Sequence, residues 1–209
     1  MGRTSDARER LMRAAGELWH TRSYADVGVS EICDCAGVQK GSFYHFFPSK
    51  RDLALAVIDE TWKRVGEGRA AAILTGSLPP LERIVRYLEA GLEEQVRLKA
   101  ETGAVPGCQF GNLLVETGNV DPVLRERLER LFADWTALMR RALDDAVAAG
   151  DLPAVDTDQA ARALLAYVEG LAVLVKATDD PRDLADLIPL AIRLAGGDPE
   201  AVRGAMARA

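Results

Sequence analysis

Apolar residues recur along most of the chain at the three-to-four-residue spacing of an amphipathic helix. Near the N-terminus one helical face carries Leu11, Ala15, Leu18 and Trp19. The polar run Thr4-Ser5-Asp6 precedes this face and is suited to open a helix. No alternating apolar and polar pattern of useful strand length interrupts the spacing. The pattern therefore predicts an all-α protein.

Glycine, proline and capping residues divide the apolar pattern into separate helices. Gly37 is suited to end a helix in a left-handed conformation, and Ser49 to cap the start of another. Asp121-Pro122 has the order of a cap followed by a first-turn proline. The predicted helices begin near residue 4 and then run from about 29 to 36, 39 to 46, 49 to 75, 81 to 102, 109 to 117, 122 to 149, 156 to 177 and 181 to 195.

The helices at 29–36 and 39–46 are short and are joined by a few residues that include a glycine. That arrangement is the helix-turn-helix, whose second helix enters the major groove of DNA. We therefore predict an N-terminal three-helix bundle with a helix-turn-helix in residues 1–50. A larger helical domain for ligand binding and dimerisation is expected in residues 51–209.

Polar groups that read base edges gather at the start of the second short helix. Gln39 is suited to a bidentate contact with adenine, Lys40 to guanine or a phosphate, and Ser42 to either. Gly41 allows a close approach to the duplex. These residues predict a DNA-reading surface.

Residues beyond the helix start are suited to phosphate contacts and to packing. Tyr44, His45 and Lys50 carry donors that would position the DNA backbone. The neighbouring phenylalanines are expected to pack in the core and hold the helix; they are Phe43, Phe46 and Phe47.

Net charge is distributed unevenly. Of the 209 residues, 48% are hydrophobic and 28% charged, and the net charge is -6. Residues 1–51 carry eight Lys/Arg and six Asp/Glu, a local net charge of +2, whereas the remainder carries 18 basic and 26 acidic residues, a net of -8. This asymmetry has the sign expected of an N-terminal module that meets phosphates.

The chain shows no signal peptide and no apolar run long enough to span a bilayer. Its cysteines number three, which favours reduced thiols over a disulfide framework. We therefore expect a cytoplasmic protein without a membrane partner.

The stretch AGVQKGSFYHFFPSKRDLALAVI, within residues 11–58, resembles the DNA-binding domain of the tetracycline-repressor (TetR/AcrR) family of bacterial regulators. The positions that match the family pattern are Gly37, Gly41, Tyr44, Phe47, Lys50 and Leu53. The resemblance implies a homodimer, a C-terminal ligand-binding domain and release of a palindromic operator when an effector binds. It also implies phosphate contacts from Tyr44, His45 and Lys50.

The helix at about 156–177 is apolar nearly all round, which requires burial on more than one side, and the helix at 181–195 adds a further set of apolar residues. We predict that they form the dimer interface by packing against their copies as a four-helix bundle. The alternative is that both belong to the core of one subunit.

Aromatic and polar residues of the intervening helices are candidates to line an effector site, which is usually apolar with a few polar groups. They are Trp62, Tyr87, Phe110, Asn112, Trp135 and Tyr167.

Cys108 follows the loop 103–107 and opens the helix at 109–117, where aligned amides favour a thiolate. Lys176 ends an otherwise apolar helix, where its cation could meet a thiolate. The stretch PGCQFGNLLVE resembles a TetR subgroup with a Gly-Cys pair at this place and a late lysine. That subgroup includes regulators that respond to electrophiles or oxidants, and others that bind acyl or acrylate-like ligands. The hypothesis is that Cys108 is a sensor thiol with Lys176 as its activating or trapping neighbour; the alternative is an inert packing cysteine.

Other functions find little support in the residues. A metal site at Cys33 and Cys35 would need further ligands, and the chain has only two histidines, His20 and His45, so we expect neither a metal site nor a cofactor. No phosphate loop, nucleophile elbow or zinc-histidine pair points to an enzyme. A DNA-binding regulator, most simply a repressor, is the prediction. A helical ligand-binding protein that does not read DNA is the alternative, and an enzyme comes after it.

Overall fold

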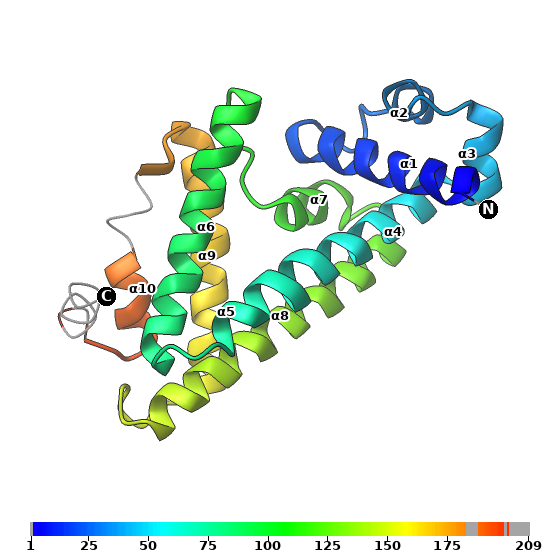
Figure 1. The fold of residues 1–209 in the computed structure, drawn as a ribbon. Helices are drawn as coiled ribbons and strands as arrows, with labels where there is room; N and C mark the ends of the chain where they lie inside the picture. The colour runs from blue at the N-terminus through cyan, green and yellow to red at the C-terminus, as the bar shows by residue number, and fades with distance from the viewer. Residues whose placement is uncertain (1, 183–187, 199, 201–209) are drawn as a thin grey trace. The chain divides into compact units, whose positions relative to one another are not determined.

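The computed structural model describes residues 2–182, 188–198 and 200, with side chains from residue 6 onward. Helices account for all the regular structure in these ranges (Figure 1), which confirms the predicted all-α class. Contacts between Cα atoms divide the chain into two compact units. The N-terminal unit comprises Met1–Lys63 and Cys108–Arg130, and the C-terminal unit comprises Arg64–Gly107 and Leu131–Ala209.

The N-terminal unit is built on α1 (Gly2–Thr21), against which α2 (Val29–Ala36), α3 (Lys40–Phe46) and α4 (Lys50–Trp62) pack. A further helix, α7 (Gln109–Thr117), also packs on α1. The core between these helices excludes solvent almost completely; its fully buried members include Leu11, Ile32, Phe43 and Leu53. The predicted three-helix bundle is thus present, and α4 and α7 enlarge it.

The C-terminal unit contains α5 (Ala71–Leu74), α6 (Pro80–Thr102), α9 (Thr157–Thr178) and α10 (Ile188–Leu194). Within it α6 packs on α5, and α10 packs on both α6 and α9. The long helix α8 (Pro122–Ala148) begins in the N-terminal unit and continues into this one. The helix predicted from residue 181 to 195 is described only in part, because residues 183–187 lie outside the described ranges.

The segment predicted as one helix from residue 49 to 75 is not uniform, which corrects that prediction. After α4, residues Lys63–Ala70 form a π-helix, η1, before α5 resumes the α-helical hydrogen bonds. The π segment contains Gly66 and Gly68, whose lack of a Cβ makes an irregular backbone easier to adopt. It also begins at Lys63, where the N-terminal unit's first segment ends.

The two compact units do not follow the division at residue 50. Residues 108–130 join the N-terminal unit although they lie far along the chain, because α7 packs on α1. The functional division into a DNA-binding part in residues 1–50 and a ligand-binding part in residues 51–209 stays a prediction.

None of the helices in the described ranges is both long and apolar enough to cross a membrane.

Candidate nucleic-acid interface

The turn between α2 and α3 is set by Gly37. This residue has φ 61° and ψ 39°, and its N–H bonds to the carbonyl of Asp34 while Val38 N–H bonds to that of Cys33 at 2.9 Å. A left-handed residue at this place ends α2 at little cost only if it is glycine. The Gly37 carbonyl also accepts from Arg10 of α1 at 3.5 Å. The turn that aims α3 is therefore held from α1 as well.

The helix α3 separates a buried face from an exposed one. Phe43 is 0% exposed and Phe47 3%, and Phe46 packs against the same core. The predicted packing role of the three phenylalanines is confirmed. Burial of these rings fixes the orientation of a helix of only seven residues.

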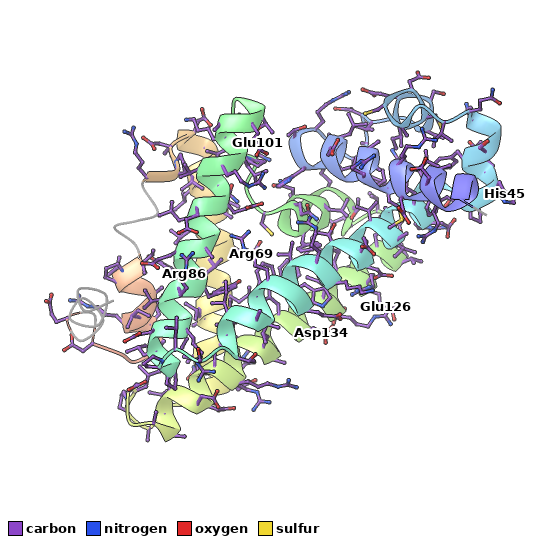
Figure 2. The ribbon with its side chains drawn as sticks, viewed as in Figure 1. His45, Arg69, Arg86, Glu101, Glu126 and Asp134 are labelled. Carbon is purple, nitrogen blue, oxygen red and sulfur yellow. The ribbon has the colours of Figure 1, made fainter. Side chains whose placement is uncertain are left out.

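The residues predicted to read DNA lie on the exposed side of α3 and at its N-terminal cap. Tyr44 is 51% exposed, although its ring edge contacts Phe43. His45, labelled in Figure 2, is exposed near the C-terminal end of the helix. The remaining exposed members are Gln39, which is the N-cap of α3, Lys40, Gly41 and Ser42. The fold thus gathers six of the seven predicted DNA-binding residues on one short segment.

Lys50, the seventh of these residues, is half-buried at the start of α4. Its ammonium donates to the carbonyls of Tyr24 at 2.7 Å and Val27 at 3.1 Å, and it lies 4.2 Å from the centroid of the Tyr24 ring. Burial lowers the pKa of Lys50, and the negative charges of Glu116 and Asp26 oppose that effect. The lysine therefore holds the α1–α2 turn, residues 22–28, and one of its three N–H groups remains for another acceptor.

A second charged residue, the acidic Glu116 of α7, also holds the α1–α2 turn. Glu116 accepts from the Ser23 hydroxyl at 2.8 Å and from the Tyr24 N–H at 2.7 Å. Nothing in the sequence pattern distinguishes this exposed glutamate, because the contact joins residues 92 and 93 positions apart. Arg10 was likewise missed, since its role depends on where α1 meets the turn.

Cys108 lies at the cap of α7, as predicted. Its sulfur accepts from the N–H of Gly111 at 3.4 Å, and the residue is half-buried. Cys33 is buried and Cys35 is exposed, so the two thiols of α2 differ in access to solvent. Burial is also the main reason why the pKa of Cys33 is raised.

The loop before Cys108 is fixed within the C-terminal unit. Gly107 has φ +74°, and its N–H and carbonyl both bond to the Gln95 side chain. A Cβ at Gly107 would lie 3.0 Å from the Ala172 carbonyl oxygen and 3.5 Å from Cδ of Lys176. Val105 N–H bonds to Asp179 at 2.8 Å. The exposed Lys176 of α9 thus packs beside the residue that precedes Cys108 in the chain.

Four of the predicted effector-site residues meet in two pairs. Trp62 and Phe110 meet edge to face in the N-terminal unit, with centroids 6.3 Å apart. In the C-terminal unit, Trp135 Nε1 donates to the Tyr87 hydroxyl at 2.7 Å. Asn112 is half-buried, and so is Tyr167, whose pKa is raised by burial.

Both parts of the chain match models of one protein family. Residues 11–57 match the family described as bacterial regulatory proteins, tetR family, and residues 80–189 match the tetracyclin repressor-like C-terminal domain.

Relatives cover most of the chain. The transcriptional regulator AcuR of Cereibacter sphaeroides is 34% identical over 174 residues, which are 81% of this chain and 76% of AcuR. The repressor NemR of Escherichia coli is 26% identical over 140 residues, or 67% of this chain and 68% of NemR.

Solved structures agree with these relatives. The crystal structure of a regulatory protein TetR from Rhodobacter sphaeroides has a TM-score of 0.78 at 32% identity, and covers 91% of this chain and 97% of that one. The reduced form of E. coli NemR has a TM-score of 0.79 at 24% identity, and covers 90% and 97%. The latter likeness concerns the fold alone.

Three findings point to the same kind of protein: the helix-turn-helix with its exposed polar face, the two family matches and the relatives. Proteins of this kind bind DNA operators, usually act as dimers with small-molecule effectors, and are not enzymes. The chain therefore belongs to the tetR family of bacterial transcriptional regulators and is a DNA-binding regulator.

Proposed function

We propose that the protein is a homodimeric repressor that binds a palindromic operator and releases it when an effector binds or when Cys108 is modified. DNA binding is supported by the exposed polar side of α3, a helix that the buried Phe43 and Phe47 hold in place.

The proposed contacts with DNA follow from the chemistry of that side. Gln39 and Lys40 would read base edges in the major groove, with Ser42 beside them and Gly41 allowing close approach. Tyr44 and His45 would bind phosphates, which position the protein without reading sequence. Lys50 would add a phosphate contact through the N–H that its bonds to Tyr24 and Val27 leave over.

Exposed apolar residues of α9 and α10 support the proposed dimer. Val173 is 64% exposed and Leu174 60%, and α10 adds Leu190 at 42% and Leu194 at 47%. Large apolar residues grouped in this way on packed neighbouring helices are typical of a surface that a second subunit covers. A dimer would also present two recognition helices to half-sites about 34–36 Å apart.

The position of Cys108 supports its proposed role as a sensor. The thiol caps a helix start, and the preceding Gly107 packs against Lys176. A thiolate is favoured near such amides and near a cation. Addition to an activated alkene then needs no other reactant: sulfur bonds to the β-carbon, the π electrons move to the α-carbon, and water supplies the proton there. With a peroxide as the oxidant, the O–O bond would break and the Cys108 sulfur would become a sulfenic acid. The Lys176 amine is the proposed trapping neighbour: its nitrogen would bond to that sulfur as the hydroxyl leaves as water.

An effector that binds reversibly would contact the predicted aromatic residues instead of Cys108. The polar Tyr87–Trp135 pair in the C-terminal unit offers a phenol and an indole among apolar neighbours, which suits a small ligand with one or two polar groups. The other proposed effector-binding residues are Tyr167 of the same unit and, in the N-terminal unit, Trp62, Phe110 and Asn112.

Release requires only a modest difference in free energy. An effector or adduct that favours the non-binding state by about 2.3 kcal/mol weakens DNA binding about fiftyfold. A population shift of this size is therefore sufficient, and no unfolding is needed.

The test uses a duplex enriched from a random library by the reduced protein. The exposed Cys35 on α2 would confound any thiol reagent, so all variants carry Cys35→Ser. We expect N-ethylmaleimide to weaken binding at least about tenfold when Cys108 is present, and less than about twofold in Cys108→Ser. Equal release of both proteins would refute the sensor role, whereas failure to enrich any duplex would refute the DNA-binding function.

A further inference from the structure

Glu116 occupies an unusual position in α7, because this short helix has the candidate sensor at its other end. Cys108 is the N-cap, and Glu116 is the last residue but one. The eight residue-to-residue steps from Cys108 to Glu116 span about 12 Å at the helical rise of 1.5 Å per residue. A helix this short moves as one element, so a displacement of its first turn reaches Glu116.

The α1–α2 turn lies between two charged groups. Glu116 accepts from Ser23 and from the Tyr24 N–H, while Lys50 donates to the Tyr24 and Val27 carbonyls. The peptide groups of this turn are therefore fixed by α7 on the donor side and by α4 on the acceptor side. The turn leads directly into α2, on which the recognition helix packs.

Packing beside this contact is incomplete. A small cavity of about 20 Å³ lies between α1, α4 and α7, with room for about one water molecule. Its lining includes Trp19, Tyr24, Ala54, Phe110, Leu113 and Glu116. Nε1 of Trp19 is buried and has no hydrogen-bond partner among the described residues. The directional contact between α7 and the turn comes from the Glu116 carboxylate.

We propose that Glu116 is the positioning residue through which α7 holds the helix-turn-helix in its DNA-binding geometry. Modification of Cys108 would then weaken DNA binding by drawing this carboxylate away from Ser23 and Tyr24. The second statement rests on the proposed sensor function, whereas the first does not. Without the Glu116 contact, the α1–α2 turn is less ordered in the free protein. Ordering it on binding costs conformational entropy, and this cost lowers the affinity for DNA.

The test compares Glu116→Gln with two variants in the Cys35→Ser background. Ser23→Ala removes one of the two donors to Glu116. Glu126→Gln is the matched control, because Glu126 is an exposed glutamate of the same unit whose partner, Arg130, is one turn along α8 (Figure 2). Circular dichroism establishes whether each variant is folded. If Glu116→Gln does not fold, Ser23→Ala still tests the contact.

The first readouts concern the reduced proteins. We expect Glu116→Gln to bind the enriched duplex about tenfold more weakly, Ser23→Ala about threefold more weakly, and the control within about twofold. Hydrogen exchange of the amides in residues 22–28 should be faster in Glu116→Gln and unchanged in the control. Wild-type affinity together with wild-type exchange in Glu116→Gln would overturn the positioning role.

The second readout tests coupling to Cys108. N-ethylmaleimide should accelerate exchange in residues 22–28 of the parent protein, which carries Cys35→Ser alone and serves as the wild type in this comparison. In Glu116→Gln it should cause less than about a threefold further loss of affinity, because the contact is already broken. An equal loss in both proteins would overturn the coupling. If the wild type does not respond to the reagent while Glu116→Gln still binds weakly, the sensor function fails and the positioning role stands.

Discussion

The ammonium nitrogen of Lys50 lies 2.7 Å from the carbonyl oxygen of Tyr24 and 4.2 Å from the centroid of the Tyr24 ring. A single charged group thus joins the start of α4 to the turn that precedes α2. The same group has an N–H left for a phosphate, so one residue can serve both the fold and DNA binding.

Lys50→Met should therefore have two separable effects. The thermal midpoint should fall by several degrees, because two buried carbonyl bonds to a cation are lost. The slope of log Kd against log salt should also decrease by about 0.9, the value for one phosphate contact. Lys40→Met is the control, with no loss of thermal stability. A reduced midpoint with an unchanged slope in Lys50→Met would limit Lys50 to the structural role.

Tyr24 makes stability sensitive to alkaline pH. Burial, with a contribution from Asp121, raises the pKa of Tyr24 from 10.0 to about 12. Between these values the phenol ionises in the unfolded chain but stays protonated in the folded one. Stability is therefore fully present below pH 10 and is lost as the pH rises towards 12.

Urea unfolding of the wild type and Tyr24→Phe between pH 9 and 11 measures this effect. The wild type should lose about 1 kcal/mol more than the variant by pH 11. Parallel losses in both proteins would show that Tyr24 titrates normally.

Local signals in the sequence predicted the helix-turn-helix well. Gly37 marks the end of α2 and Ser49 the start of α4, through backbone and capping preferences that act within a few residues. The exposed and buried sides of α3 followed from the chemistry of its side chains. The cap at Cys108 was predicted in the same way.

Features that depend on distant parts of the chain were not predicted. Gly66 and Gly68 make an irregular backbone easier to adopt in η1, but they do not specify a π-helical hydrogen-bond register, so the register was not predicted. Glu116 bonds to a turn 92 residues earlier, and residues 108–130 join the N-terminal unit through packing on α1. Such contacts are decided by tertiary packing, which periodicity does not encode.

Gly107→Ala should destabilise the protein. A residue with a Cβ is strained at φ +74°, and the added carbon would lie 3.0 Å from the Ala172 carbonyl oxygen. We expect the free energy of unfolding in urea to fall by about 1–3 kcal/mol. Gly91→Ala is the control, since a Cβ there meets open space on α6 and should be neutral or stabilising. Equal stabilities of the two variants would contradict the tight packing of the loop.

Leu174→Glu should disrupt the dimer. Leu174 is 60% exposed on α9, where a buried charge in a subunit interface would be costly. Sedimentation velocity should show monomers at concentrations where the wild type is dimeric, and operator affinity should fall. Val96→Glu is the comparison, because Val96 is also half exposed but lies on α6. If Leu174→Glu remains dimeric, α9 does not form the interface.

The most direct test of the whole account is the sequence of the DNA that the protein selects. Reduced protein would be incubated with random duplexes at low and moderate salt, and the bound fraction sequenced over successive rounds. We predict a palindrome whose half-sites are centred about one helical turn of DNA, or a multiple of it, apart. In Gln39→Ala, the protein should lose its preference for bases that the wild type selects. Enrichment of no sequence at either salt concentration would contradict the account.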